Sequence, residues 1–416
     1  MKYYLWVLGC SMNYSDAERI ATVMDLLGYK EAEVENEADV VISVACSVRQ
    51  TAIDRIYGKT RDWNNKRSKN PGFKTILSGC VLPEDKKKME KSFDLIFQIS
   101  EMERLVDFLS PRKNIKGLSG EYLSLLPTHE SSFRAFVPIM TGCNNFCSYC
   151  AVPYTRGREK SRPQEEIINE VTDLINRGYK EIHLLGQNVN SYANDFGDLL
   201  KKLDAIQGDW RGYFYSNHPK DFSDELINII VCLEHFPRYI HLPLQSGNDR
   251  ILRDMNRHYT KKSYLELTNK IREAMPDVVL TTDVIVGYPG EGDAEFADTV
   301  EVVKEAKFEM IFIGKYSPRP GAKSAKLVDS VPKNIKEERD KILTKILGDN
   351  LEEINSKFVG QKIKVLIDEN KGTKFYGRTA GYKVVEIRTN QSLELGQFVE
   401  VEVNSASAWK IFAEII

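Results

Sequence analysis

The sequence predicts an α/β protein built of three parts: a small parallel α/β domain over residues 1–127, a partial (β/α) barrel of six units with a closing helix over 128–356, and a small OB-like β-barrel over 357–416. Three observations lead to this fold. Short apolar runs alternate with helical patterns in the first two parts, which is typical of parallel sheets. The last part, about 60 residues long, reads as short strands separated by turn residues. The length of 416 residues also suits two or three domains.

The first part contains three short apolar runs that each end in a cysteine. YYLWVLGC ends at Cys10, ADVVISVAC at Cys46 and FKTILSGC at Cys80. With one helical pattern between the first two runs and another over 48–67, they predict a β-α-β-α-β unit with a parallel sheet. The carboxyl ends of parallel strands meet at one edge, where ligands bind. The three thiols could therefore hold an iron–sulfur cluster with one open iron, or they could be buried structural cysteines.

The second part alternates strands and helices six times. The predicted strands are FRAFVPIM, EIHLLGQ, GYFYSN, YIHLPLQ, LTTDVIVGYP and MIFIGKYS, and the first helix is expected over 162–177 with Ser161 as its N-cap. Sites in (β/α) barrels lie at the C-terminal ends of the strands. Polar and glycine residues at these ends are candidates for cofactor contacts, although such residues are equally common in structural turns. The candidates are Gln187, Ser216, Gln245, Asp283 and Gly287.

The loop after the first of these strands reads GCNNFCSYC and places Cys143, Cys147 and Cys150 in a C-x3-C-x2-C pattern. Three thiolates can hold three irons of a 4Fe–4S cube, which usually has four cysteine ligands, so one iron stays open for a substrate or cofactor. The alternative is zinc, but zinc loops carry a second pair of ligands downstream, and no such pair follows in this sequence. The spacing therefore favours an iron–sulfur cluster.

Composition and charge fit a large globular enzyme. Apolar residues make up 42% and charged residues 28% of the chain, and the net charge is −2. This balance gives no sign of overall affinity for nucleic acid, so any RNA contact must come from local patches. The start MKYYLWVLGC has neither the basic residues nor the long apolar stretch of a signal peptide or membrane anchor. We expect a cytoplasmic monomer whose thiols serve metal binding rather than disulfides.

The run from Gly142 to Pro163, GCNNFCSYCAVPYTRGREKSRP, resembles the radical S-adenosylmethionine (SAM) methylthiotransferases, and among them the branch that modifies tRNA. The first two N-terminal cysteines stand in similar surroundings, GCSMN at 9–13 and VACSVR at 44–49, where the family usually has G-C-x-M-N and N-T-C-x-V-R. Ser11 replaces the usual Gln, and Val-Ala replaces the usual Asn-Thr. These departures change the polar neighbours of the thiols, and such neighbours tune a cluster.

The resemblance implies a reaction and its cofactors. Each cysteine triad would bind a 4Fe–4S cluster, and SAM would occupy the open iron of the core cluster, with a reduced flavodoxin or ferredoxin-type protein as electron donor. A radical from one SAM would take the hydrogen from carbon 2 of isopentenyladenosine beside the tRNA anticodon. A methylthio group, formed with a second SAM at the other cluster, would replace it. Threonylcarbamoyl-adenosine in tRNA and an aspartate of a ribosomal protein are the competing substrates, and a non-catalytic iron–sulfur RNA-binding protein is the competing class.

The last part, with its strands QKIKVLIDEN, KFYGRTAGYKVVEIR, GQFVEVEVNS and WKIFAEII, is similar to the TRAM domain, an RNA-binding barrel. This resemblance makes basic residues near the core cysteines and on the barrel candidates for phosphate contact, although a run of charges is more often a solvated loop. The candidates are Arg156, Arg158, Lys160, Arg162, Arg378, Lys383 and Arg388. The segment DRILRDMNRHYT, with Arg253, Arg257 and His258, offers a weaker case of the same kind.

Overall fold

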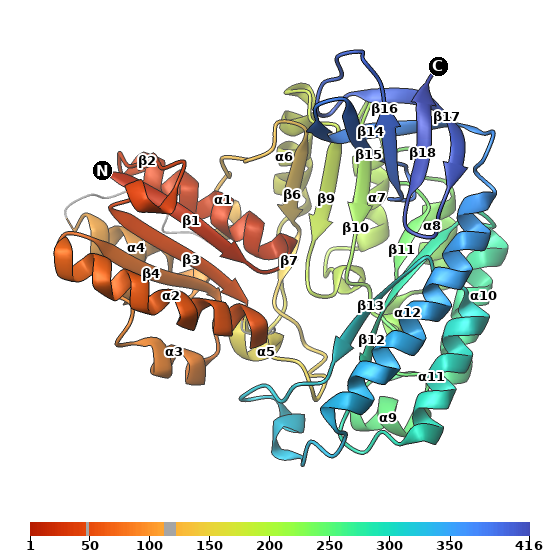
Figure 1. Cartoon of the computed structure of the whole chain (residues 1–416), viewed down its shortest axis with the longest axis horizontal. Coiled ribbons are helices and arrows are strands. Elements are labelled where there is room, and N and C mark those ends of the chain that lie inside the picture. Colours follow the sequence, from red (N-terminus) through yellow and green to blue (C-terminus); the bar gives the residue numbers. More distant parts are fainter. Residues whose placement is uncertain (47–49, 112–121) are drawn as a thin grey trace.

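The computed structural model describes residues 1–46, 50–111 and 122–416. An N-terminal α/β domain lies beside a six-stranded core, and a small β-barrel covers one end of that core (Figure 1). The predicted α/β class and the three kinds of architecture are confirmed. Ser47, Val48 and Arg49, which belong to the second N-terminal motif and to the start of the expected helix over 48–67, lie outside the described residues. None of the helices within these ranges is long and apolar enough to cross a membrane.

The N-terminal domain has a parallel sheet in the order β2-β1-β3-β4-β5. Its strands are β1 (Lys2–Leu8), β2 (Lys30–Glu31), β3 (Val40–Cys46), β4 (Lys74–Cys80) and β5 (Leu95–Ile96). Every residue of β3 is buried, because helices cover both faces of the sheet, as is usual for parallel strands. The edge strands β2 and β5 were absent from the prediction because two residues are too few to show a period.

Helices pack on both faces of this sheet. On one face, α1 (Ser11–Leu26) and α4 (Met102–Leu109) share a core that includes Ile20, Val40 and Leu105. On the other face, α2 (Gln50–Lys69) and α3 (Pro83–Met89) share a core around Trp63 and Leu77. The first helix begins directly after Cys10, which is its N-cap. The first cysteine therefore sits where a strand turns into a helix.

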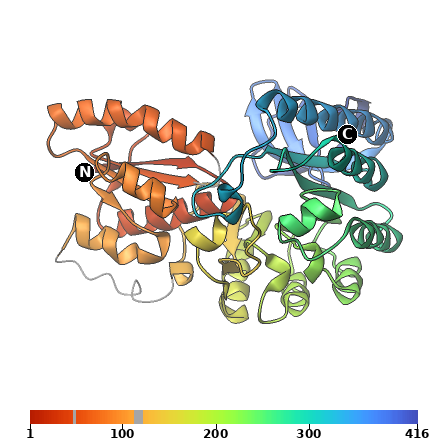
Figure 2. The same cartoon turned by 90° about the horizontal axis from the view of Figure 1, so that it is seen from below.

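The core contains all six predicted strands: β6 (Arg134–Pro138), β9 (Glu181–Leu185), β10 (Arg211–Phe214), β11 (Tyr239–His241), β12 (Val279–Val286) and β13 (Met310–Lys315). They form two parallel three-stranded sheets, β10-β9-β6 and β11-β12-β13, which together curve into a partial barrel. Figure 2 shows the helices on the outer side of these strands. They are α6 (Gln164–Asn176), α7 (Phe196–Asp204), α8 (Asp224–Val231), α9 (Asp249–Asp254), α10 (Lys261–Ala274), α11 (Asp293–Ala306) and α12 (Lys333–Ser356).

The segment between β6 and α6 differs from the prediction in one respect. Ser161 is not the N-cap of α6, because the helix begins at Gln164 with Pro163 as its N-cap. Ser161 lies instead in β8 (Lys160–Ser161), which pairs with β7 (Met140–Thr141) in an antiparallel ladder. The core cysteines and the short helix α5 (Val152–Thr155) lie between these two strands in the chain. The ladder therefore closes the base of the cysteine loop.

The C-terminal part is a closed barrel in the order β14-β15-β16-β18-β17. Its strands are β14 (Lys362–Lys371), β15 (Lys374–Arg378), β16 (Val384–Arg388), β17 (Phe398–Ala406) and β18 (Ile411–Ile415). It packs on the end of the core that lies away from α5 and β7 (Figure 1). The turn between β15 and β16 enters that end, where the ring of Tyr382 lies 5.1 Å from that of Tyr213 between centroids. Tyr382 has a left-handed φ of 63°.

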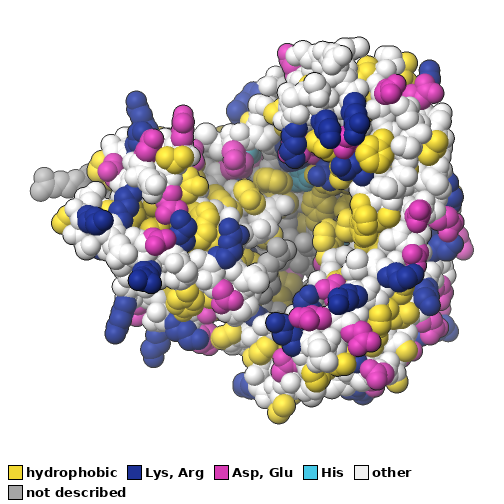
Figure 3. Space-filling model, in the orientation of Figure 1, with side chains coloured by type: hydrophobic (Ala, Val, Ile, Leu, Met, Phe, Trp, Pro, Cys, Tyr) yellow, Lys and Arg dark blue, Asp and Glu magenta, His cyan; other side chains and the backbone are white. Residues whose placement is uncertain are grey.

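A hollow opens between the N-terminal domain and the core, and hydrophobic side chains form part of its wall (Figure 3). The arrows of β1 and β3 point toward the core (Figure 1), so the carboxyl edge of the N-terminal sheet faces it. Helix α1 joins the two parts. The hydroxyl of Ser15 donates to the backbone oxygen of Phe136 at 3.2 Å, and Arg19 lies 3.8 Å from Glu170 in a buried ion pair.

Candidate active site

The core cysteine loop follows β6 and β7 at the C-terminal end of the partial barrel, where sites in such barrels lie. Cys143 and Cys147 are 8% and 9% exposed, and Cys150 is partly exposed. Gly142 is required before the loop, because a Cβ at this position would lie 2.1 Å from the backbone oxygen of Arg158 and the φ there is 79°. The backbone at the start of the loop is therefore strongly constrained.

The end of α9 holds this loop from the side of the core. The backbone nitrogen of Ser148 donates to the oxygen of Met255 at 2.9 Å, and Asn256 donates its side-chain amide to two carbonyl oxygens of the loop. The buried Arg257 donates from Nη1 to the sulfur of Cys147 at 3.4 Å. The weaker expectation that Arg257 contacts RNA is therefore wrong, because its guanidinium is enclosed next to a cysteine.

The three N-terminal cysteines lie at the same edge of their sheet, on adjacent strands. Cys46 and Cys80 are the last residues of β3 and β4 and are register partners, while Cys10 follows the end of β1. Adjacent strands lie about 4.8 Å apart, so neighbouring thiols are within reach of one cluster. Asn13 contacts two of the three: its Oδ1 accepts from the backbone nitrogen of Cys10 at 3.3 Å, and its Nδ2 lies 3.9 Å from the sulfur of Cys80. The expected convergence at the carboxyl edge is present.

One arginine of the core loop reaches this N-terminal triad. Arg156 follows α5, and its side chain is 2% exposed. Its Nε donates to the sulfur of Cys80 at 3.0 Å, and its Nη2 pairs with Asp16 of α1 at 2.5 Å. Its Nη1 donates to the hydroxyl of Tyr122 at 3.3 Å. The segment that follows the core cysteines therefore contacts the N-terminal triad directly through this side chain.

The donor sets of both triads fit iron–sulfur clusters. Within the described ranges, no three His, Cys, Asp or Glu side chains already meet as the ligands of one ion would. A cube differs in that each thiolate binds a different iron, which suits more widely spaced thiols. Burial raises the pKa of Cys150 to about 12, and a hydrogen bond with Cys46, together with burial, raises the pKa of Cys80 well above its usual range. Metal-free Cys80 and Cys150 are therefore protonated at neutral pH, and cluster binding must release their protons.

Three of the expected cofactor contacts lie around this end of the core in different roles. The Oε1 of Gln187 accepts from the backbone nitrogen of Gly142 at 2.6 Å, so this side chain supports the cysteine loop. The carboxylate of Asp283 is 38% exposed and lies 3.1 Å from Nε2 of His241. Gly287 has a φ of 73°, which favours glycine. Gln187 and Asp283 are both partly exposed, but Gln187 already uses its side-chain oxygen to hold the cysteine loop.

Ser216 and Gln245, the other two expected contacts, share an uncommon backbone conformation. Their φ angles are 64° and 68°, a left-handed geometry that costs a non-glycine residue about 1–3 kcal/mol. They follow β10 and β11 respectively, and the backbone nitrogen of Gln245 donates to the oxygen of Asp283 at 2.8 Å. Strained residues that recur at the carboxyl ends of neighbouring strands mark this end of the core as the candidate site.

Comparison with known proteins identifies the family. The model “Uncharacterized protein family UPF0004” matches residues 2–99, “Radical SAM superfamily” matches 137–303 and “TRAM domain” matches 359–416. A tRNA-2-methylthio-N(6)-dimethylallyladenosine synthase from Clostridium novyi (strain NT) is 39% identical over 439 aligned residues, which cover 100% of this chain and 96% of that protein. The chain belongs to the radical SAM methylthiotransferase family.

Further relatives and solved structures agree with this assignment. A protein of the same name from Bacillus cereus (strain B4264) is 37% identical, covering 100% of this chain and 86% of its own. The radical S-adenosylmethionine methyltransferase TsrM from Kitasatospora setae superposes with a TM-score of 0.54 at 11% identity, over 75% of this chain and 72% of that chain. The cobalamin-dependent radical enzyme OxsB also gives 0.54, at 10% identity, over 83% and 56%. At such identities the likeness shows the fold alone.

Two of the expected RNA contacts in this methylthiotransferase are internal. Arg162 is 2% exposed, and its Nη1 lies 2.7 Å from the carboxylate of Glu170. Arg156 is enclosed beside Cys80 and Asp16 as described above. A buried guanidinium that already has a carboxylate partner cannot reach a phosphate, so the expectation is wrong for both residues. Arg158 and Lys160 are exposed and stay candidates for RNA contact.

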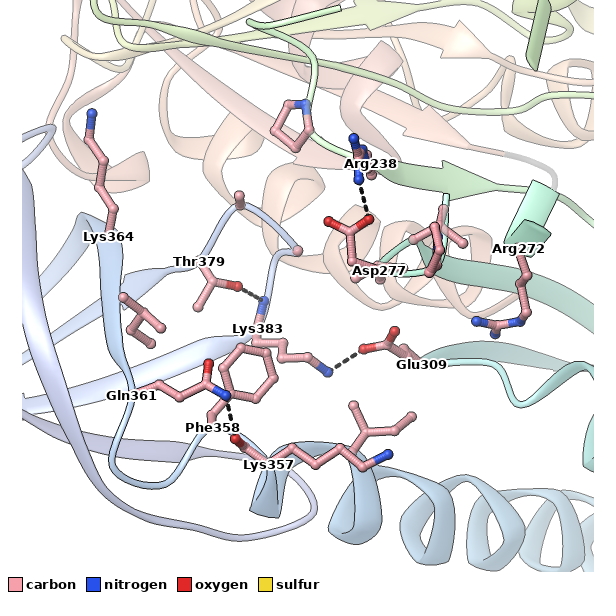
Figure 4. Close-up of a pocket in the computed structure, with 18 of the residues that line it drawn as sticks. Arg238, Arg272, Asp277, Glu309, Lys357, Phe358, Gln361, Lys364, Thr379 and Lys383 are labelled. Atoms are coloured by element: carbon pink, nitrogen blue, oxygen red, sulfur yellow. Dashed lines mark hydrogen bonds and ion pairs between the residues drawn. The ribbon is translucent and has the colours of Figure 1, made fainter. Parts of the chain in front are cut away.

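The expected contacts on the TRAM barrel also divide. Figure 4 shows Lys383 pointing to Glu309 where the barrel meets the core, and its Nζ lies 2.5 Å from that carboxylate with the lysine side chain 9% exposed. RNA contact by Lys383 is therefore wrong, since its charge serves the joint between domains. Arg378 is 33% exposed and pairs with Asp368 at 2.9 Å. Arg388, at 68% exposed, is the most accessible of the three.

Sequence reasoning missed a group of cations around Arg388. The buried carboxylate of Glu386 is approached by Arg388 at 3.1 Å, by Lys410 at 2.9 Å and by Lys374 at 3.8 Å. Lys410 also lies 5.0 Å from the ring centre of Tyr376. Cations beside an aromatic ring are typical of surfaces that bind single-stranded RNA. Lys374 lies in β15, Arg388 in β16 and Lys410 directly before β18. The barrel must close before these cations meet, so no local sequence pattern predicts the group.

Proposed function

We propose that this methylthiotransferase converts isopentenyladenosine in tRNA into its 2-methylthio derivative. Relatives named tRNA-2-methylthio-N(6)-dimethylallyladenosine synthase align with the whole chain at 37–39% identity, which supports this substrate. The observation that carries the proposal is the presence of two cysteine triads, with Arg156, which closely follows the core triad in the chain, in contact with Cys80 of the other triad. Replacing a hydrogen by a methylthio group needs one centre that removes hydrogen and a second that delivers sulfur, and each triad can serve one of these tasks.

The division of labour follows from the position of each triad. Cys143, Cys147 and Cys150 would hold one 4Fe–4S cluster, and the N-terminal triad would hold the other. When bound there with SAM, these groups supply the one-electron chemistry that removes hydrogen from an unactivated C–H bond and the sulfur that takes its place. Gln187 fixes the start of the core loop through its hydrogen bond. The partly exposed Asp283 offers an acceptor to amino and hydroxyl groups of SAM or of the substrate.

Phe312 supports the choice of an isopentenyl group. Its ring is 50% exposed, and its register partner is Asp283, so both side chains project from the same face of the sheet. From this face it reaches a cavity of about 280 Å³ on the TRAM side of the core, which it lines together with aromatic side chains that include Tyr382. The cations of that cavity, such as Lys383, already have carboxylate partners. Such walls favour a base with a hydrocarbon tail over the carboxylate of threonylcarbamoyl-adenosine, which would lose hydration there.

The tRNA would be held by basic side chains outside the hollow. Lys and Arg side chains gather on the TRAM barrel above the hollow (Figure 3), and the group around Glu386 includes Arg388, Lys374 and Lys410. Arg158, at the edge of the core loop, would add a contact near the site. Phosphate contacts of this kind fix the orientation of an RNA without reading its sequence. A reduced flavodoxin or ferredoxin-type donor, a monomeric state and a cytoplasmic location complete the proposal.

Mass spectrometry of tRNA nucleosides tests the substrate. A strain that lacks the gene should accumulate isopentenyladenosine and lose its 2-methylthio derivative, and a plasmid with the parent gene should restore it. The Cys46→Ala variant should fail to restore it at equal protein level. A deletion strain that loses instead the methylthio form of threonylcarbamoyl-adenosine, or the modification of a ribosomal-protein aspartate, would assign the enzyme to that competing substrate.

A second measurement separates the enzyme from a non-catalytic RNA-binding protein. Anaerobically reconstituted protein, mixed with SAM and a chemical reductant, should form 5′-deoxyadenosine, because SAM cleavage needs the core cluster alone. The Cys143→Ala variant should not form it. Tight tRNA binding without any 5′-deoxyadenosine in the parent protein would identify a binding protein and contradict the proposed activity.

A further inference from the structure

Arg156 belongs to the core in sequence, but its side chain contacts residues of the N-terminal domain. It follows Cys150 closely in the chain, and its Nε lies 3.0 Å from the sulfur of Cys80 at the end of β4. Asp16 of α1 holds the two terminal nitrogens of the guanidinium, and Tyr122 accepts a further hydrogen bond from it. The side chains of Arg156 and Asp16 are 2% and 1% exposed, so water does not weaken these contacts.

We propose that Arg156 is a positioning residue that raises the reduction potential of the N-terminal cluster through its N–H···S bond to Cys80. The inference rests on the proposed function, since it takes Cys10, Cys46 and Cys80 as the ligands of that cluster. Reduction adds negative charge to a cluster, and a donor on a ligand sulfur stabilises the reduced form, so the potential rises. The low local dielectric of a buried site strengthens this effect.

The contacts around Cys80 show why Arg156 should dominate. Asp16 has the opposite charge and acts in the opposite direction, but it binds the terminal nitrogens of Arg156, whereas the sulfur contacts Nε directly. Asn13 also points an amide at the same sulfur, but from 3.9 Å, which is long for a hydrogen bond. The signs of the effects of Arg156 and Asp16 are therefore opposite, and this difference can be measured.

The core triad has a counterpart of this arrangement. Nη1 of Arg257 lies 3.4 Å from the sulfur of Cys147, and its Nη2 donates to the backbone oxygen of Pro243. Each triad therefore receives one buried arginine, but Arg257 comes from the core itself, whereas Arg156 crosses between domains. Arg158, two residues along from Arg156, is exposed and contacts neither set of thiols in the described structure. These residues provide matched controls.

A redox titration followed by electron paramagnetic resonance tests the proposal on anaerobically reconstituted, full-length protein. A parent with Cys143→Ala, Cys147→Ala and Cys150→Ala identifies the signal of the N-terminal cluster. We expect Arg156→Gln to shift the midpoint potential of that cluster to lower values and Asp16→Asn to shift it to higher values. The potential of the core cluster should stay unchanged in both. Arg257→Gln should lower the core potential instead, and Arg158→Gln should move neither.

The outcomes distinguish this inference from the proposed function. Iron analysis of the parent protein should give about eight irons per chain for two 4Fe–4S clusters. A parent content near four would overturn the N-terminal site and the inference together. Full iron content with an unmoved potential in Arg156→Gln, or with the same direction of shift in Asp16→Asn, would overturn the inference alone. If Arg156→Gln loses iron, Arg156→Lys serves as the second variant, because it keeps a charge and a hydrogen-bond donor. It should retain the cluster at a reduction potential below that of the parent. A potential equal to that of the parent would overturn the role of the Nε contact.

Discussion

Removing the charge of Glu181 should destabilise the joint between the core and the TRAM barrel. Glu181 is 0% exposed and lies 2.5 Å from Arg134, 2.8 Å from Arg211 and 2.7 Å from His183, and Tyr382 of the TRAM barrel donates to it at 3.3 Å. Burial by itself would raise the pKa of Glu181, but the hydrogen bond with His183 and the charges of the two arginines outweigh burial and hold the pKa well below its usual range. The carboxylate therefore stays ionised at neutral pH.

The size of the effect follows from burial. Glu181→Gln keeps the shape but leaves Arg211, whose side chain is 7% exposed, without its full counter-charge. Breaking a buried pair in this way costs about 3–5 kcal/mol, whereas a surface pair contributes about 0–1 kcal/mol. Asp173 and Arg177 form such a surface pair, 63% and 54% exposed, so Asp173→Asn is the matched control. At about 2 °C per kcal/mol, Glu181→Gln should lower the Tm by about 6–10 °C and the control by less than about 2 °C.

Thermal unfolding of the metal-free protein, followed by fluorescence at several pH values, measures both effects. The folded pKa of Glu181 lies below its unfolded value of about 4.3, so its stabilisation is complete above that pH and is lost as the pH falls toward the folded pKa. The difference in Tm between parent and Glu181→Gln should therefore be full at pH 7 and shrink below about pH 4. A Glu181→Gln protein that melts together with the Asp173→Asn control at pH 7 would refute the reasoning.

Three further variants test the sites. Gly142→Ala should cost the core cluster and halve the iron content, because the new Cβ would lie 2.1 Å from the backbone oxygen of Arg158; a full iron content would show that the loop can shift. Cys46→Ala should keep SAM cleavage, measured as 5′-deoxyadenosine, yet stop thiolation of tRNA, and normal thiolation would make this cysteine structural. Arg388→Gln with Lys374→Gln should weaken tRNA binding and reduce the slope of log affinity against log salt by roughly 1.4, measured by fluorescence anisotropy; an unchanged slope would leave the barrel as a structural lid.

The fold was largely predictable because its elements are long and periodic. Each of the six core strands is an apolar run of a length that a strand can bury, and β3 and β4 of the N-terminal domain end at cysteines as expected. The two-residue strands β2 and β5 and the short helix α9 escape such reasoning, because a few residues show no period. The start of α6 was misplaced because Ser161 is paired in β8, and a good capping residue nearby does not reveal this pairing.

The candidate site was predictable only as far as its signals are local. The cysteines can be recognised in the sequence by their spacing within a loop or by their position at the end of a predicted strand. The use of a charged side chain depends on its partners in space, and these partners are distant in the chain. Arg156 meets Asp16 and Cys80, and Lys383 meets Glu309. From the sequence alone, a basic residue beside a cysteine loop is predicted to contact RNA. The burial that excludes this role can be seen only in the three-dimensional structure.

The register of the N-terminal sheet limits how a chain of this kind can change in length. Cys46 and Cys80 face each other as partners at the ends of β3 and β4. Because side chains alternate along a strand, deleting one residue inside either strand would turn its thiol to the opposite face of the sheet. The connecting helices and loops carry no such restriction. Insertions and deletions should therefore accumulate in the connections, while the strands keep the same length, residue for residue, from one descendant sequence to the next.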